Sequence, residues 1–268
     1  MVATRPLAPS SPPAASVRSM PRIRDIHASD LHWALREGVQ DFLTFRGDII
    51  LAGFIYPAVA LLAAALALGG EMIPIIFPMA AAFSLLGPII AIGFYEMARR
   101  RESGMEAGWS HFLDPLRGAN RWQIVGLSLA LVTLTLGWLF MANSIYADTI
   151  GRLHPAGLGD FLSMLFTTGE GWRMILFGNF VGLAFAIVTL VTMIVSFPML
   201  VDRNVHASDA LETSLRASFH NPVMTLRWGL YVAVILALAC VPLFLGLAVA
   251  LPVLGYASWH LYTRMVER

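Results

Sequence analysis

Two ionisable side chains lie at the ends of long apolar runs, where a charge could do chemistry. Glu96 comes directly after the second apolar run of the chain, and His260 lies near the end of the last one. Ionisable residues inside a membrane often belong to a transport or binding site, so Glu96 could gate a vestibule or bind a cation. The alternative is structural, because Arg99 and Arg100 follow Glu96 at helical spacing and the side chain can reach water from a helix end. We favour the structural role for Glu96 and for His260.

Two amides and a face of small residues occupy the third and fourth apolar runs. Asn143 and Asn179 lie toward the arginine-poor ends of these runs. They could line an outward-facing polar pocket, but such amides more often hydrogen-bond to a neighbouring helix, a contact worth about 1 kcal/mol or less. Gly178, Gly182 and Ala186 form a small-x-x-x-small face beside Asn179, which allows two helices to approach closely. We expect this face to pack within the monomer.

Sequence patterns for enzyme chemistry are absent. The chain has no P-loop, no dinucleotide-binding glycine motif, no HExxH and no nucleophile elbow. The single cysteine, Cys240, excludes an internal disulfide and a multi-cysteine metal site. We therefore assign no catalytic, cofactor-binding or metal-binding residue and lean toward a protein that is not an enzyme. Arg99-Arg100-Arg101 is explained as charge at an anionic lipid surface, so no nucleic-acid partner is expected.

The composition indicates a membrane protein. Of the 268 residues, 57% are hydrophobic and 13% are charged, and the mean hydropathy is +0.70. A soluble domain has about 25% charged residues. Every basic residue is an arginine, a bias typical of a GC-rich bacterial coding sequence, and we expect the bacterial inner membrane as the location. Residues 1–22 have the composition of a disordered tail, and residues 23–268 are expected to form one transmembrane domain.

Uncharged apolar runs of about 20 residues predict helices that span the bilayer. Four such runs are Ile49–Leu68, Ile73–Phe94, Ile124–Ile145 and Met174–Leu200. The last apolar region, Trp228–Tyr262, would be about 50 Å long as a straight helix, which is too long for one span. We expect two helices there, joined by a turn near Pro242–Gly246.

Arginines set the expected orientation. They cluster before the first run, between the second and third runs, between the fourth and fifth, and after the last. The connector between the third and fourth runs carries only Arg152 before Gly171 and is expected outside. The positive-inside rule therefore predicts an all-α fold with six transmembrane helices and both termini in the cytoplasm. A short helix capped by Asp160 is expected on the outer surface over Asp160–Phe166.

The tetrapeptide HASD occurs twice, at residues 27–30 and 206–209. After the first copy, Leu31, Leu35, Val39 and Phe42 share one helical face, and a matching pattern follows the second copy. A poorer third copy covers residues 112–117, where a proline limits the helix.

The apolar runs repeat as well, because Pro88 precedes Glu96 at the spacing at which Pro252 precedes His260. We predict three repeats, residues 25–101, 104–203 and 206–268, each an amphipathic helix followed by a transmembrane hairpin. The alternative is that any cytoplasmic connector of a membrane protein becomes amphipathic and arginine-rich.

Four stretches are similar to a known family: SLLGPIIAIGFYEMARRRE, TTGEGWRMILFGNFVG, FPMLVDR and PLFLGLAVALPVLGYASWHLYTR. They resemble a widespread bacterial family of predicted integral membrane proteins that carry a domain of unknown function, and the resemblance runs from about Ile23 to the C-terminus. It implies a polytopic inner-membrane protein without an assigned activity. Members are sometimes labelled cytochrome c oxidase subunit I, but a haem–copper centre needs several intramembrane histidines, and only His260 of the seven lies in an apolar run.

Two functions remain open. The first is a non-catalytic accessory, scaffold or assembly role, with the lipid bilayer as environment and another membrane protein complex as partner. The second is a carrier for a small apolar or lipid-like solute, because internal repeats are frequent in transporters. A cavity lined by Glu96, Asn143, Asn179 or His260 would favour the carrier. The sequence leaves the oligomeric state open.

Overall fold

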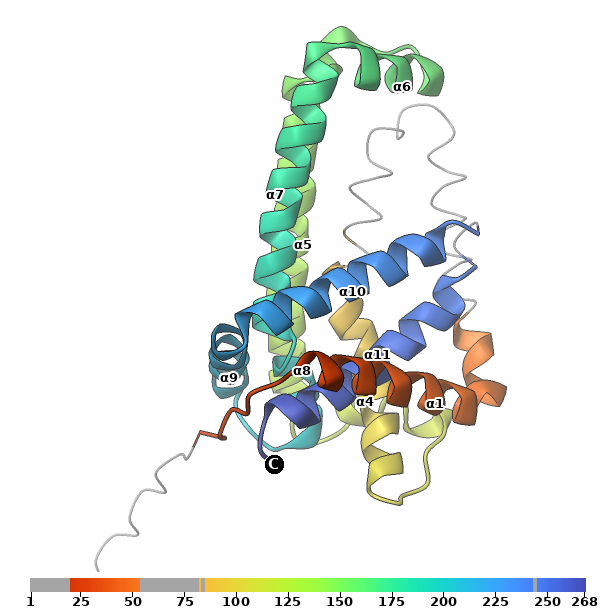
Figure 1. The fold of residues 1–268 in the computed structure, drawn as a ribbon, viewed down its shortest axis with the longest axis vertical. Coiled ribbons are helices and arrows are strands. Elements are labelled where there is room, and N and C mark those ends of the chain that lie inside the picture. The colour runs from red at the N-terminus through yellow and green to blue at the C-terminus, as the bar shows by residue number, and fades with distance from the viewer. Residues whose placement is uncertain (1–19, 54–81, 83–84, 243–244) are drawn as a thin grey trace, which may run out of the picture.

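The computed structural model describes residues 20–53, 82, 85–242 and 245–268, drawn as a coloured ribbon in Figure 1. The expected tail, most of the expected first span Ile49–Leu68, and much of the expected second span Ile73–Phe94 lie outside the described residues. Every regular element in the described part is a helix, which confirms the all-α class.

Two long antiparallel helices, α5 (Arg121–Asp148) and α7 (Gly169–Met193), rise side by side from the rest of the structure (Figure 1). We call them the α5–α7 hairpin. Three helical stretches of the described residues are long and apolar enough to cross a membrane, namely Arg121–Asp148, Gly169–Asp202 and Pro222–Cys240. They match the third and fourth expected spans and the first half of the last apolar region. The total of six spans stays a prediction.

A short helix lies across the far end of the hairpin, where a surface-lying helix was expected. It is α6 (Leu158–Thr167), and it lies at the opposite end of the molecule from the C-terminus (Figure 1). The helix begins two residues before Asp160, so this residue lies in the first turn rather than at the cap position. Its Oδ2 accepts a hydrogen bond from the N–H of Ala156 at 3.0 Å, which fixes the chain entering the helix.

The expected fourth span is broken near its end. A separate helix, α8 (Ser196–Asp202), follows α7 after a short turn. Pro198 has no N–H with which to continue the hydrogen-bond ladder of α7. The N–H of Val195 instead donates to Oγ of Ser214 on the next helix, α9 (Ala207–His220), at 3.2 Å. The break separates the largely exposed α7 from α8, which is mostly buried.

The last apolar region forms two helices, as predicted. α10 (Pro222–Cys240) ends before the expected turn, and α11 (Leu247–Met265) begins after it. A glycine is required at Gly246, since a Cβ there would lie 2.7 Å from the backbone of Ala239. α11 is not among the three described helices with the length and composition of membrane spans, and most of it is buried in the core.

The core forms where α11 packs against α1 (Ala28–Gly53), α4 (Gly87–Glu102) and α8. Its largest fully buried side chains are Trp228, Trp259, Tyr256, Tyr262, Phe94 and Phe197. The buried face of α1 includes Ala34, Gly38 and Asp41, whereas Val39, which was expected to face inward, is 43% exposed. Leu31 and Phe42 of the predicted face are buried as expected, and the buried stripe also includes small residues that let α1 approach α11 closely.

Both HASD segments begin helices. α1 starts at Ala28 and α9 at Ala207, and in each the N–H of the aspartate donates to the histidine carbonyl, at 3.0 and 3.1 Å. The middle copy, residues 112–117, instead contains a 3₁₀ turn, Asp114–Leu116, and follows another, Trp109–His111. α1 continues for 26 residues and α9 for 14, so the copies share a start but not a length. The three-repeat organisation stays a prediction.

Candidate functional site

Glu96 lies on α4 and is 3% exposed. Its carboxylate accepts hydrogen bonds from Nε and a terminal nitrogen of Arg99 at 2.8 and 2.7 Å, and from Nε of Arg100 at 2.7 Å. The hydrogen bond to Glu96 raises the pKa of Arg99. A terminal nitrogen of Arg100 also donates to Oδ2 of Asp114 at 2.7 Å, and this ion pair connects α4 to the 3₁₀ turn Asp114–Leu116. This carboxylate is therefore held in an ion-pair chain within its own part of the fold.

His260, on α11, bonds a residue that the sequence did not single out. Its Nε2 lies 2.8 Å from Oδ2 of Asp41 on α1, and the other carboxylate oxygen forms an ion pair with Arg101 at the end of α4. Asp41 is 1% exposed. The His260 ring also packs edge-on against Trp33 at 5.5 Å between centroids. Asp41, Arg101 and His260 thus join three helices through one buried carboxylate; we call them the Asp41 cluster.

A sequence signal for Asp41 exists in the periodicity of α1. Leu31, Ala34 and Gly38 are buried at helical spacing, and Asp41 follows three residues later on the same face. A carboxylate on the buried face of a helix needs a cationic partner. The cation, Arg101, lies 60 residues from Asp41 along the chain and His260 lies 219 residues from it, so neither partner could be found from the spacing alone.

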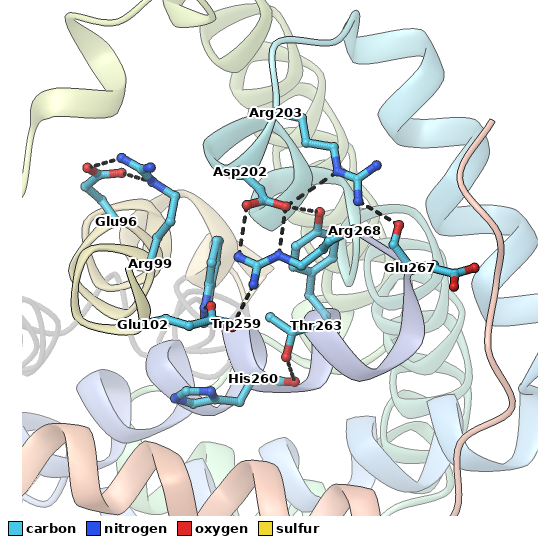
Figure 2. Close-up of polar contacts among 11 residues, drawn as sticks. Glu96, Arg99, Glu102, Asp202, Arg203, Trp259, His260, Thr263, Glu267 and Arg268 are labelled. Carbon is cyan, nitrogen blue, oxygen red and sulfur yellow. Dashed lines mark hydrogen bonds and ion pairs between the residues drawn. The ribbon is translucent and has the colours of Figure 1, made fainter. Parts of the chain in front are cut away.

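A second polar network holds the C-terminus (Figure 2). Arg268 donates to Asp202 at the end of α8 at 3.0 and 2.9 Å, and to Glu102 at the end of α4 at 2.7 Å. Its guanidinium also lies 5.0 Å from the ring centroid of Trp259. Partial burial opposes the charge, but the hydrogen bonds to both carboxylates outweigh it and raise the pKa of Arg268. The Tyr262 hydroxyl also donates a hydrogen bond to Oδ2 of Asp202 at 2.8 Å.

Arg268→Gln is expected to lower the free energy of unfolding by about 1.5 kcal/mol, because it removes charge-assisted hydrogen bonds from a partly buried pair of carboxylates. Thermal unfolding in detergent, followed by tryptophan fluorescence, measures the loss. The control is Arg173→Gln, which breaks only an exposed pair with Glu170 and should cost less than about 0.5 kcal/mol. Equal losses in the two variants would show that the network adds no stability.

The two amides do not point into the core. Asn143 on α5 and Asn179 on α7 are both exposed. The side-chain amide of Asn179 donates to the carbonyl of Ile175 on its own helix at 2.7 Å. Both amides therefore lie on the outer surface of the α5–α7 hairpin.

The small-residue face makes one close contact. A Cβ on Gly182 would lie 3.2 Å from the ring of Trp138 on α5, so the two hairpin helices approach there. A Cβ on Gly178 would meet no described atom within 4 Å, and Ala186 is exposed. Most of this face is therefore not covered by described residues.

The comparisons with known proteins bear on the middle of the chain. Residues 76–202 match the family DUF2189, described as a predicted integral membrane protein. The match confirms the family resemblance over that region. No curated protein and no solved structure matched the chain.

The DUF2189 region contains the ion-pair chain of Glu96, the α5–α7 hairpin and Asp202. Arg268 and Tyr262, which bond Asp202, lie outside it, and so do Asp41 and His260 of the Asp41 cluster. The resemblance was expected to extend from Ile23 to the C-terminus, and the match is shorter. In the described residues, no three His, Cys, Asp or Glu side chains come together as a metal-binding group.

Proposed function

We propose that this protein is a non-catalytic accessory or scaffold protein of the bacterial inner membrane, and that the α5–α7 hairpin binds another membrane protein. The observation that carries the proposal is the position of Asn143 and Asn179. Both amides are exposed on helices that are otherwise apolar and long enough to cross a bilayer.

The surface around these amides has the character of a lipid-facing surface. Phe140, Leu176 and Phe180 are 73%, 67% and 70% exposed. Asn179 lies about 8 Å along α7 from Met174, where the expected span begins. Asn179 donates one amide hydrogen to the Ile175 carbonyl of its own helix, which leaves its side-chain oxygen to face hydrocarbon. An unpaired polar atom there is unfavourable, whereas a hydrogen bond from a neighbouring transmembrane helix satisfies it. The uncovered Gly178 beside Asn179 would let the backbone of a partner helix approach.

The pairing of the chain ends supports a common side for both termini. Ile23 forms an antiparallel bridge with Val266, and the N–H of Arg24 donates to the carbonyl of Met265 at 2.9 Å. These segments lie at the end of the molecule opposite α6 (Figure 1). Since arginines cluster in the connectors near this end, we assign it to the cytoplasm by the positive-inside rule.

The carrier hypothesis gains no support from the described residues. Glu96 and His260 are engaged in ion pairs or hydrogen bonds near the core, whereas Asn143 and Asn179 face outward from the hairpin. These four side chains therefore do not line a common cavity.

A photo-crosslinking residue placed at Asn179 in cells tests the proposed interface. We expect a discrete adduct with another membrane protein. The control position is Val234, which is 47% exposed on α10 and should give lipid adducts only. Adducts from position 179 that contain only lipid, or only residues 49–94 of the same chain, would show that no protein partner covers this surface.

The double variant Asn143→Leu/Asn179→Leu is expected to fold normally and to lose the partner. Each interhelical hydrogen bond contributes about 1 kcal/mol, so their joint loss should weaken binding about tenfold or more. The measurement is the amount of the crosslinked partner recovered after mild detergent extraction. Ser144→Ala is the matched control, because the one hydrogen of the Ser144 hydroxyl already goes to the Phe140 carbonyl of its own helix at 3.0 Å, whereas an amide keeps a second N–H for a partner. Unchanged recovery from the double variant would count against the proposal.

A further inference from the structure

We propose that the groove between the N-terminal segment and α9 binds the phosphate of an anionic phospholipid, whose acyl chains lie along α10. The inference rests on the proposed membrane placement but needs no protein partner. The groove is an open depression of about 620 Å³. Its lining includes Arg22 from the N-terminal segment and Arg216, Phe219 and His220 from α9.

The groove contains two arginines that form no ion pair with a described residue. Arg22 and Arg216 are exposed, and neither has an ion-pair partner among the described residues. Glu212 also lines the groove, and Asp25 lies 2.8 Å from Nε2 of His220, so the site is not purely cationic. Two guanidinium groups facing one depression suit a phosphate, because their planar donors pair with its oxygens.

The arginines at the opposite end of the molecule differ. Arg152 lies 2.8 Å from Asp148 and Arg173 lies 3.0 Å from Glu170, each within one turn of the same helical stretch. Both therefore have a neutralising carboxylate. The contrast between the two ends favours an anionic ligand at the groove.

The apolar surface beside the groove identifies the ligand as a lipid rather than a free phosphate. Phe219 is 74% exposed at its edge. Val223, Leu226 and Leu230 follow at helical spacing on α10 and are 67%, 50% and 60% exposed. Val223 lies four residues after Phe219, on α10, which follows α9 and has the character of a membrane span (Figure 1). A headgroup in the groove would place its acyl chains along these apolar side chains.

The test uses the full chain in nanodiscs of phosphatidylcholine with or without one-fifth phosphatidylglycerol, and native mass spectrometry counts the retained lipid. We expect phosphatidylglycerol to be retained and enriched over its share of the bilayer. The double variant Arg22→Gln/Arg216→Gln should lower that retention about tenfold. The matched control is Arg152→Gln/Arg173→Gln, which should leave it unchanged.

Three results would overturn the proposal. The first is equal retention of the two lipids, and the second is unchanged retention in the groove variant. The third is that millimolar inorganic phosphate displaces the bound lipid as effectively as a short-chain phosphatidylglycerol does. Both groove arginines are exposed, so thermal unfolding of the variant should match the parent and show that it folds. The crosslink from position 179 should persist in this variant, which separates failure of the lipid site from failure of the partner interface.

Discussion

Asp41→Ala is expected to lower the free energy of unfolding by about 3 kcal/mol, which is at the lower end of the range for breaking a buried ion pair. Asp41 is 1% exposed, and its carboxylate holds Arg101 and His260 from two other helices. Removal would leave a guanidinium without its counter-ion and an imidazole without its hydrogen bond. The loss is not larger because Arg101 remains 38% exposed and can turn toward water. Thermal unfolding in detergent measures the effect.

Asp148→Ala is the matched control for this variant. It breaks an ion pair with Arg152 in which both side chains are largely exposed, 75% and 67%, and such pairs contribute about 0–1 kcal/mol. Asp41→Asn should fall between the two, because an amide keeps a hydrogen bond to His260 but not the charge that pairs with Arg101. If Asp41→Ala unfolded at the temperature of Asp148→Ala, the Asp41 cluster would not join the three helices energetically.

The membrane-type helices could be predicted because their signal is local. α5 and α10 each contain a long run with few charges, and a run of that kind predicts a helix whatever surrounds it. The division of the last apolar region into two helices followed from arginine counts on either side of it. Neither inference required knowing which residues contact one another in the folded protein.

The broken fourth span and the buried polar groups depend on contacts between distant residues. The break after α7 needs Pro198, but it also needs Ser214 of α9 to accept the N–H of Val195. The role of Asp202 depends on Arg268, which lies 66 residues away. The spacing of charges along α4 predicted that Glu96 pairs with Arg99 and Arg100. No comparable spacing in the sequence indicates the contacts between different helices.

The predicted buried face of α1 was right at Leu31 and Phe42, which are buried, and wrong at Val39, because large apolar residues were weighted over small ones. Val39 was placed inside, but α1 packs on α11 through Ala34 and Gly38. Two helices that approach closely bury small residues at their contact, and the larger neighbours then lie at its edge. Hydropathy alone does not record this, since glycine and alanine are nearly neutral.

The close packing of α1 on α11 predicts a large effect for Gly38→Ala. A Cβ there would lie 2.6 Å from the Val253 carbonyl oxygen and 2.8 Å from Cβ of Ala257, so backbone atoms would have to move. We expect the free energy of unfolding to fall by about 2–3 kcal/mol. Gly126→Ala on α5 is the matched control, because its Cβ would meet no described atom within 4 Å. Helix propensity alone should make that control about 0.5–1 kcal/mol more stable. Opposite signs in thermal unfolding would locate the tightest contact between α1 and α11 at Gly38, whereas stabilisation by both alanines would mean that the helices are not in contact there.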